Sequence, residues 1–414
     1  MSTRVSSLHA PCIFAAILLA GGCGSEKTRP ETVVNSHSPF ELSLTAEEIA
    51  AGWISLFDGE SLFGWTATSN ANWTVVDGAI TVSQGDAGFL RSNSQFADFE
   101  LSVEFKSALG TNSGIFLHAP EEPNDPLADC YELNIADVGV SPFPTGSFVG
   151  RLGASGNEAE RRARDKHEWQ SFYIRALNGV FTVELDGERV LEYTDPQPLG
   201  RGHIILQMNS GAVAFRNIKL RPLRLRDMMT ESTYANAWTG TKGRSATFEF
   251  ANGELSVQGG PGQLESRERF SDFIAQTEIK VNGEGLNSGI FFRNIPGEFQ
   301  QGYESQIHNG FADNDRSKPV DFGTGAIFRR QAARRIVAND HAWFTKTLIC
   351  TENHMAVWVN GYPVTEWTDE RPEHENPRQG LRLTAGTFTL QAHDPTTDLS
   401  FRKFRVTEMP KRRD

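Results

Sequence analysis

The sequence predicts an all-β protein built from two tandem β-sandwich domains of the jelly-roll type. Three observations lead to this prediction: polar and apolar residues alternate along many short segments, turn residues separate these segments, and one ordered set of motifs occurs twice. The chain has 414 residues, 38 of them glycine. That length suits two domains, and a hydrophobic content of 38% suffices for packed cores.

The charge balance narrows the class of partner. The formal net charge is −12 at pH 7, whereas a nucleic-acid-binding protein needs a basic face. We therefore expect no nucleic-acid partner. The basic run at residues 221–226 is interpreted as a solvated edge that closes the first domain.

The first 44 residues are set aside because they have the features of an export signal. An apolar run at residues 13–20 is followed by Gly21-Gly22-Cys23. The run is shorter than the ~20 residues that span a bilayer, but it fits a secretory signal. The pattern resembles a bacterial lipoprotein signal over residues 1–23, with a lipidated Cys23 and a polar tether over residues 24–44. We expect an exported protein anchored to a membrane by lipid, in the periplasm or at the cell surface; an ordinary signal peptide is the alternative.

The chain repeats itself at an interval of about 175 residues. Asn-Ser-Gly-Ile-Phe occurs at 112–116 and 287–291, Tyr-Glu at 131–132 and 303–304, Leu-Gln at 206–207 and 390–391, and Phe-Arg at 215–216 and 401–402. Solenoid repeats are ~20–50 residues long, so this interval indicates tandem domains. We place the domains at residues 45–223 and 232–408, with a linker at 224–231 and a basic tail at 409–414, and expect each half to close its own core.

Within each copy the pattern is that of consecutive strands. One helix start is indicated by Thr45 and Glu48, which form a capping-box pattern before residues 49–51. Residues 99–106 alternate between apolar and polar side chains, which predicts a strand with one buried face. Residues 172–191 predict strands separated by turns at 178–179 and 186–187, and the second copy has the matching turn at 360–361.

Strand alternation assigns the motifs of the second copy to faces of a sheet. Glu304, Gln306 and His308 project together, as do Gln391 and His393, and as do Asn287, Phe291 and Arg293. The result is a polar stripe across three strands. Ordinary solvated residues of an antiparallel sheet are the alternative interpretation.

The first copy carries a thinner version of this stripe. It keeps Asn112 and Glu132, but His118 replaces Arg293, Asn134 replaces Gln306, and Asn209 replaces His393. If only one copy does chemistry, we expect it to be the second.

Other kinds of site find little support in the sequence. There is no zinc-type cysteine pair, EF-hand loop, phosphate-binding loop or Gly-x-Ser-x-Gly motif. Ser113 and Ser288 should point into the sandwiches, and Cys130 and Cys350 should be buried apolar residues. The acidic loop at 313–315 could hold a structural Ca²⁺, but hydration explains it more simply. We therefore expect no cofactor and no metal.

With these motifs in order, the chain resembles the 3-keto-disaccharide hydrolase domain family. Residues 53–65, Trp-Ile-Ser-Leu-Phe-Asp-Gly-Glu-Ser-Leu-Phe-Gly-Trp, are similar to the opening signature of that family. The resemblance covers roughly 52–223 and 232–408, although the second copy keeps only a vestige of the signature around Trp238. It implies a concanavalin-like jelly roll and action on 3-keto sugars. In the second copy the family motifs fall on Asn287, Arg293, Glu304, Gln306, Gln391, His393 and Arg402.

The residue types suit that chemistry. A ketone at C3 acidifies the proton at C2, so a base can remove it while a cationic group holds the enolate and an acid assists departure of the C1 substituent. Glu304, Arg293 and His393 supply these three types. The candidates for substrate binding come from both copies. They are Asn287, Gln306, His308 and Gln391 of the second copy and Glu132, Asn112 and His118 of the first. A direct glycosidase needs two carboxylates, and the second copy offers one.

These observations predict an exported enzyme that cleaves 3-keto-glycosides or 3-keto-disaccharides by proton abstraction, elimination and hydration. The main alternative is a non-catalytic carbohydrate-binding lipoprotein, because sandwich folds also host lectins and the fold does not fix the function. A surface scaffold is a weaker third interpretation.

Overall fold

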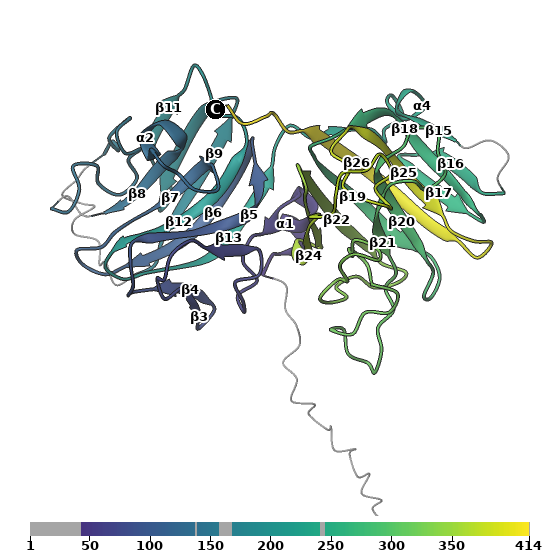
Figure 1. The fold of residues 1–414 in the computed structure, drawn as a ribbon, viewed down its shortest axis with the longest axis horizontal. Coiled ribbons are helices and arrows are strands. Elements are labelled where there is room, and N and C mark those ends of the chain that lie inside the picture. Colours follow the sequence, from purple (N-terminus) through teal and green to yellow (C-terminus); the bar gives the residue numbers. More distant parts are fainter. Residues whose placement is uncertain (1–42, 137–138, 157–167, 241–244, 414) are drawn as a thin grey trace, which may run out of the picture. The chain divides into compact units, whose positions relative to one another are not determined.

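The computed structural model describes residues 43–136, 139–156, 168–240 and 245–413. The expected signal, Cys23 and most of the tether lie outside the described residues. The described chain forms two β-sandwiches with three short helices, α1 (Ala46–Ala51), α2 (Pro126–Asp129) and α4 (Tyr234–Ala237) (Figure 1). In the part of the chain that the structure describes, no helix is long and apolar enough to cross a membrane.

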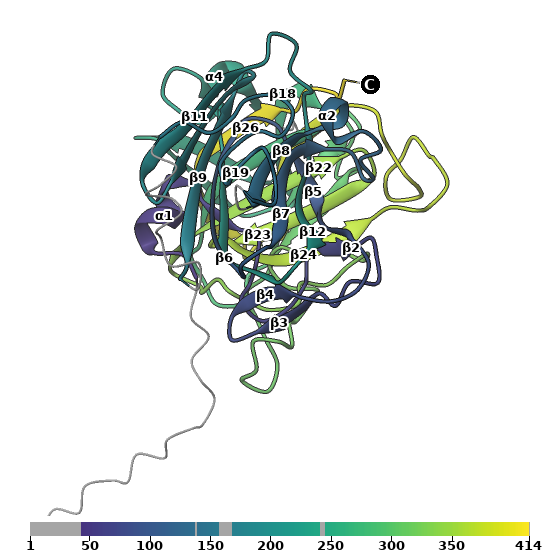
Figure 2. The ribbon, with the colours of Figure 1, turned by 90° about the vertical axis from the view of Figure 1, so that its left-hand side faces the viewer.

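The first sandwich consists of a larger and a smaller antiparallel sheet. The larger sheet has the order β11-β10-β9-β6-β13-β4-β3, with β1 paired to β13, and the smaller has the order β2-β5-β12-β7-β8. The larger sheet contains β1 (Ile54–Ser55), β3 (Thr74–Val76), β4 (Ala79–Val82), β6 (Phe99–Ser107), β9 (Gln170–Leu177), β10 (Val180–Leu185), β11 (Glu188–Thr194) and β13 (Val213–Pro222). The smaller sheet contains β2 (Trp65–Ala67), β5 (Gly88–Phe96), β7 (Asn112–Ala119), β8 (Tyr131–Ala136) and β12 (Gly202–Ser210). Figure 2 shows β6 and β9 in one layer and β5, β7, β8 and β12 in the other.

The second sandwich repeats this arrangement strand for strand. Its larger sheet has the order β16-β17-β26-β19-β22-β23-β24, with β14 paired to β26, and its smaller sheet has the order β15-β18-β25-β20-β21. The larger sheet contains β14 (Arg226–Asp227), β16 (Thr247–Ala251), β17 (Glu254–Gln258), β19 (Phe273–Val281), β22 (Trp343–Thr351), β23 (His354–Val359), β24 (Tyr362–Thr368) and β26 (Asp398–Glu408). The smaller sheet contains β15 (Trp238–Gly240), β18 (Gly262–Phe270), β20 (Ser288–Asn294), β21 (Tyr303–Ile307) and β25 (Gly386–Ala392). The all-β class and the tandem sandwiches predicted from the sequence are thus confirmed.

The predicted alternation explains how the strands build the cores. Along β6, Phe99, Leu101, Val103 and Phe105 are fully buried, and the polar residues from Ser102 to Lys106 are only half-buried. Ser113 and Ser288 also face inward: their hydroxyls donate to the carbonyl oxygens of Gln207 and Gln391, each at 2.7 Å. Both cysteines of the described chain are free and buried.

The predicted turns and helix start are also present. The residues at 178–179, 186–187 and 360–361 all have positive φ, between 49° and 81°, as type I′ hairpin turns require. At α1 the Thr45 hydroxyl accepts from the Glu48 amide at 3.2 Å, and the Glu48 carboxylate accepts from the Thr45 amide at 2.9 Å. The sequence therefore placed these three turns and the start of α1 correctly.

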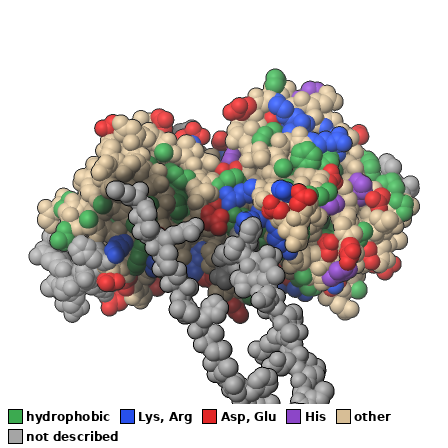
Figure 3. All heavy atoms as spheres, turned by 90° about the horizontal axis from the view of Figure 1, so that it is seen from below, with side chains coloured by type: hydrophobic (Ala, Val, Ile, Leu, Met, Phe, Trp, Pro, Cys, Tyr) green, Lys and Arg blue, Asp and Glu red, His purple; other side chains and the backbone are tan. Residues whose placement is uncertain are grey.

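The surface mixes charges of both signs. On the face drawn in Figure 3, Lys and Arg side chains lie beside Asp and Glu side chains in the described part of the chain. Several basic residues of the 221–226 run pair with nearby carboxylates: Arg221 Nε donates to Glu100 at 2.7 Å, and Arg224 lies 3.2 Å from Asp98. This run is therefore occupied by ion pairs at the edge of the first sandwich.

Candidate functional site

The polar stripe predicted for the second copy lies on the smaller sheet of the second sandwich. Glu304 and Gln306 are on β21 and Gln391 is on β25, whereas the intervening Ser305 and Ile307 point into the core and are fully buried. His308 and His393 directly follow β21 and β25. We call this group, with Asn287, Asp321 and Arg378, the Glu304 site.

A glycine makes room for the carboxyl group at the centre of this site. Glu304 pairs with Phe291, and Gly289 lies one step along the same face of β20. A Cβ atom at Gly289 would stand 2.7 Å from Oε1 of Glu304 and 3.0 Å from its Cγ. The φ angle of Gly289 is not positive, so the close approach of a side chain, not backbone freedom, accounts for the glycine of the repeated Asn-Ser-Gly-Ile-Phe motif.

Glu304 has the electrostatic character of a weak base. Burial raises its pKa to about 7, and the nearby positive charges of Arg378, His393 and Lys346 oppose that rise. Nη2 of Arg378 lies 3.8 Å from the Glu304 carboxylate, and its guanidinium also lies over the Phe291 ring at 5.5 Å. At neutral pH, Glu304 is therefore poised between its two protonation states, as general acid–base chemistry requires.

A buried lysine lies behind the strand that carries Glu304. Lys346 extends from β22 of the larger sheet, and its ammonium donates to the carbonyl oxygens of Ser305 at 2.9 Å and Gln306 at 2.7 Å. Burial lowers the pKa of Lys346 to about 7, and the nearby Glu304 carboxylate raises it in opposition. The first copy has Phe172 at the corresponding position of β9, so this cation is specific to the second copy.

Three side-chain amides offer free acceptors beside the carboxylate. Asp321 accepts from Nδ2 of Asn287 at 2.7 Å and from Nε2 of Gln306 at 2.9 Å, which fixes both amides. Among the described residues, the amide oxygens of Asn287, Gln306 and Gln391 have no hydrogen-bond partner. Buried acceptors of this kind suit the hydroxyl groups of a ligand.

The two histidines of the site differ in their surroundings. His393 is partly exposed, and its Nδ1 lies 2.9 Å from the carboxylate of Asp394. Hydrogen bonds from Thr396 and His393 lower the pKa of Asp394 to about 2, so the pair orients the ring with Nε2 available for other contacts. His308 instead accepts at Nδ1 from the Gly310 amide at 3.2 Å.

The structure does not place Arg293 in the Glu304 site, and the predicted face for Arg293 is wrong. The register between β20 and β25 breaks between Phe291 and Asn294, and Arg293 has a φ of 45°. This bulge reverses the side chain, whose guanidinium donates to the carbonyl oxygens of Ser271 and Arg382 and pairs with Asp272 at 3.0 Å. Arg293 is fully buried there.

The first copy has the same bulge, which also removes His118 from the predicted stripe. His118 has a φ of 54°, and its Nε2 lies 2.7 Å from the Ala97 carbonyl oxygen. It is packed edge-on against Phe99 and Tyr131, and burial lowers its pKa to about 4. His118 is thus a neutral core residue, contrary to the expectation that it binds substrate.

The remaining first-copy candidates form a reduced site. Burial raises the pKa of Glu132 to about 7, and a hydrogen bond from Gln207 opposes this. Asn112 begins β7 and is half-buried. Asn134 is buried and donates to Ser141 and to the carbonyl oxygen of Phe143, so it belongs to the loop packing.

Arg402 also lies away from the site. It extends from β26 of the larger sheet, where it pairs with Glu278 and stacks 4.0 Å from the centroid of the Trp343 ring. The family motif that contains Arg402 therefore stabilises the opposite sheet.

Three residues in or directly behind the Glu304 site were missed by sequence reasoning. Asp321 and Arg378 lie in long loops without periodicity, so no pattern could place them. Lys346 did leave a signal, because it shares strand parity with the buried Phe344, Leu348 and Cys350. A single charged residue on an apolar strand face is rare unless it has partners.

The acidic loop at 313–315 makes contacts of its own. Lys318 lies 2.9 Å from Asp313, and the Ser317 hydroxyl donates to Asp315 at 2.7 Å. Within the described ranges, no group of three or more His, Cys, Asp or Glu residues is placed to hold a metal ion.

Comparison with known proteins identifies the family. The sequence model of the family described as 3-keto-alpha-glucoside-1,2-lyase-like domain matches residues 52–221 and again residues 228–407. The chain belongs to this family. Its two copies correspond to the two sandwiches, and the resemblance noted in the sequence is confirmed.

Individual relatives cover about one copy. A 3-keto-disaccharide hydrolase of Bacteroides thetaiotaomicron is 29% identical over 224 residues, which cover 44% of this chain and 76% of the relative. A solved structure of a Parabacteroides distasonis protein, provisionally assigned as a glycosyl hydrolase, is 21% identical and covers 44% of this chain and 98% of its own, with a TM-score of 0.39. The carbohydrate-binding module CBM66 of Bacillus subtilis is 14% identical and covers 38% and 95%, with a TM-score of 0.29.

Proposed function

We propose that the second sandwich is a glycoside-cleaving enzyme that acts on 3-keto-glycosides or 3-keto-disaccharides. The observation that carries this proposal is the buried carboxyl group of Glu304, with its pKa near 7 and a guanidinium 3.8 Å away. Membership of the family and the name of the Bacteroides relative support the substrate class.

In the proposed reaction Glu304 is the base. Its carboxylate takes the proton from C2, which the neighbouring ketone has acidified, and negative charge moves to the C3 oxygen. Arg378 takes the role that the sequence assigned to Arg293, because its guanidinium is the cation beside Glu304. The enolate then expels the C1 substituent, whose oxygen takes a proton from His393, and addition of water across C1 and C2 completes net hydrolysis.

The amides of the site have a binding role in this proposal. The unpartnered oxygens of Asn287, Gln306 and Gln391 accept hydrogen bonds from sugar hydroxyls. Asp321 holds two of these amides in place. His308 follows Gln306 at the end of the strand and borders the same region.

Replacing Glu304 tests the assignment. Glu304→Gln keeps the size of the side chain and removes the base, so turnover of a 3-keto-disaccharide should fall by ~10²–10⁴-fold with little change in unfolding midpoint. The matched control is Glu132→Gln, which changes the equivalent carboxyl group of the first sandwich. Its effect should be much smaller, since that copy lacks counterparts of His393 and Lys346.

Three outcomes would contradict the proposal. A larger effect of Glu132→Gln would move the active site to the first sandwich. Unchanged turnover in both variants would exclude the carboxyl assignment. Sugar binding without cleavage of any 3-keto-glycoside would favour a carbohydrate-binding protein.

We also propose that the protein is exported and held at a membrane by a lipid on Cys23. The support is the short apolar run that ends in Gly21-Gly22-Cys23. Cys23→Ser should release the protein from the membrane fraction of the producing cells. A wild-type protein that is already absent from that fraction would contradict the proposal.

A further inference from the structure

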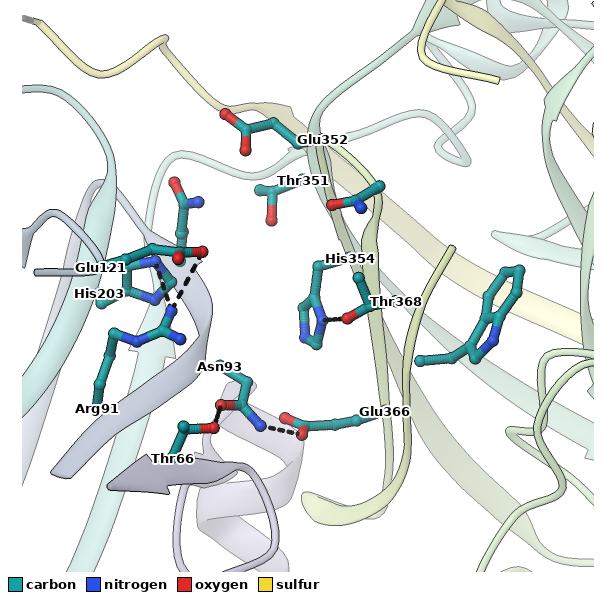
Figure 4. Close-up of a pocket in the computed structure, with 13 residues that line it drawn as sticks. Thr66, Arg91, Asn93, Glu121, His203, Thr351, Glu352, His354, Glu366 and Thr368 are labelled. Atoms are coloured by element: carbon teal, nitrogen blue, oxygen red, sulfur yellow. Dashed lines mark hydrogen bonds and ion pairs between the residues drawn. The ribbon is translucent and has the colours of Figure 1, made fainter. Parts of the chain in front are cut away.

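A polar cavity lies away from the Glu304 site, between side chains of the first and second sandwiches (Figure 4). Its volume is about 340 Å³, at the small end of the range for ligand-binding pockets. Strands β2, β5 and β12 supply one wall, and β22, β23 and β24 supply the other. Nearly every lining side chain can form hydrogen bonds.

The wall from the first sandwich is held rigid by its own hydrogen bonds. Nδ1 of His203 lies 2.7 Å from the Ser92 carbonyl oxygen, so Nδ1 is the donor and Nε2 is left as an acceptor. The Arg91 guanidinium donates to that Nε2 at 3.3 Å and lies 3.5 Å from the Glu121 carboxylate. Arg91 is therefore fixed at the cavity (Figure 4).

The wall from the second sandwich presents groups that lack partners. Nδ1 of His354 lies 3.1 Å from the Thr368 hydroxyl, which turns the ring toward the first sandwich (Figure 4). Within the described chain, Nε2 of His354 and Oγ1 of Thr351 have no hydrogen-bond partner, and on the opposite wall the same is true of Nε of Arg91. Glu366 accepts from Nδ2 of Asn93 at 2.8 Å, so this carboxyl group joins the two walls.

The charges around the cavity nearly balance. Burial lowers the pKa of His203 to about 3 and that of His354 to about 4, so both rings are neutral at pH 7. Burial raises the pKa of Glu366 to about 7. Arg91 is offset by Glu121, and the Glu352 carboxylate lies 2.9 Å from Arg201. The cavity therefore has no strong electrostatic preference for an anionic or a cationic ligand.

From this geometry we infer that the cavity is a second ligand site, which takes a neutral carbohydrate of one or two rings. Sugar hydroxyls both donate and accept, so they can satisfy Nε2 of His354, Oγ1 of Thr351 and Nε of Arg91 together. Such a ligand contacts both sandwiches at once, and the site is independent of Glu304.

Calorimetric titration of the full chain tests the inference. The probes are glucose, galactose, mannose, sucrose and trehalose, with glucuronate as the charged comparator. At least one neutral sugar should bind with one-to-one stoichiometry. Asn93→Ala and His354→Asn, from opposite walls, should each weaken binding by at least about fivefold, the effect expected for one lost hydrogen bond. His341→Asn is the matched control at an exposed histidine and should leave the affinity unchanged.

Thr351→Val guards against variants that fail to fold. Valine has nearly the shape of threonine, and the lost hydroxyl has no partner in the described chain, so the unfolding midpoint should not fall. A weaker sugar affinity in this variant then reports a lost ligand contact. Glu304→Gln should bind the same sugar as tightly as the wild type.

Four results would overturn the inference: no binding of any neutral sugar, tighter binding of glucuronate than of glucose, unchanged affinity in all three cavity variants, or loss of binding in Glu304→Gln alone. The last result would assign the bound sugar to the Glu304 site.

Discussion

At the scale of single residues, Glu304 shows how the surroundings of a β-strand can raise the pKa of a carboxyl group. The residue sits on a sheet face that would ordinarily be wet, yet loop residues such as Arg378 and the neighbouring strand cover it. Burial disfavours the charged form and raises the pKa, and the nearby cations prevent the rise from going further. The balance leaves a carboxyl group with a pKa of about 7, which suits the base of the proposed reaction.

This balance predicts the pH dependence of the reaction. Because only the ionised carboxylate can take a proton, kcat/KM should rise with pH through about 7. Arg378 favours the ionised form, so Arg378→Gln should raise the pKa of Glu304 and move the rising limb to higher pH. The measurement is the pH profile of kcat/KM for a 3-keto-disaccharide.

The exposed Arg267 on β18 supplies the matched control for that experiment. Arg267→Gln should leave the rising limb of the pH profile of kcat/KM at the same pH as in the wild type. If the rising limb of the Arg378→Gln profile stays at the wild-type pH or moves to lower pH, a group other than Glu304 titrates in the reaction.

The sequence predicted which residues share the sheet face of the Glu304 site better than it predicted which side chains surround them. Alternation placed Glu304, Gln306 and Gln391 on one face because strand geometry is local. The guanidinium beside Glu304 comes from Arg378, 74 positions later in the sequence and in a loop. No local sequence pattern predicts this contact, because it depends on the way in which the long loops fold over the sheet.

At the scale of elements, one bulge accounts for the two misplaced candidates. In both copies the register breaks near the end of a strand of the smaller sheet, at Arg293 in β20 and at His118 in β7. Each bulge packs against a glycine of the neighbouring strand: a Cβ at Gly386 would lie 2.4 Å from the carbonyl carbon of Arg293, and one at Gly202 would lie 2.3 Å from that of His118. The strict period of two fails where an extra residue enters a strand.

The bulge predicts that Arg293 serves stability and not catalysis. Arg293→Met keeps the apolar stem but leaves the carbonyl oxygens of Ser271 and Arg382 without their buried donor and removes one of the two guanidinium groups that pair with Asp272. The free energy of unfolding should fall by roughly 3–5 kcal/mol, the usual effect of breaking a buried ion pair. Urea denaturation measures this change, and turnover is then scaled to the folded fraction.

The scaled turnover of Arg293→Met should stay within a few-fold of the wild type. Glu304→Gln should show the opposite pattern, with turnover lost and stability kept. If Arg293→Met kept its stability but lost turnover, Arg293 would have to be assigned to catalysis after all.

At the scale of the whole molecule, the two sandwiches hold each other through their chain ends. Residues just before and within β1 contact the second sandwich: the Ser55 amide donates to the Gly361 carbonyl oxygen at 2.8 Å, and the Trp358 indole donates to the Ser55 carbonyl oxygen at 2.8 Å. The C-terminal residues contact the first sandwich, where the Arg413 amide donates to the Leu199 carbonyl oxygen at 2.9 Å. The described residues from 43 onward accordingly belong to one compact unit.

Buried side chains link the sandwiches as well. Arg201 of the first sandwich is almost fully buried and lies 2.8 Å from Asp272 of the second. A single apolar cluster contains Leu56 and Phe96 from the first sandwich and Ile274, Ile349 and Trp358 from the second. The repeat in the sequence did not predict this interface, because an internal repeat records what the copies share and not the contacts that one copy makes with the other.

These contacts predict that the halves unfold together, which is the reverse of what the repeat alone suggests. Fragments 45–223 and 226–414, produced separately, should each expose the apolar residues of the shared cluster. Each should therefore bind a hydrophobic dye and unfold at a lower temperature than the full chain, which should show one cooperative transition in calorimetry. Mixing the fragments in equal amounts should restore the higher midpoint and remove the dye signal, because the interface then forms again. Two separate transitions in the full chain, at the midpoints of the isolated fragments, would instead show that the interface adds little to stability and that each sandwich folds alone.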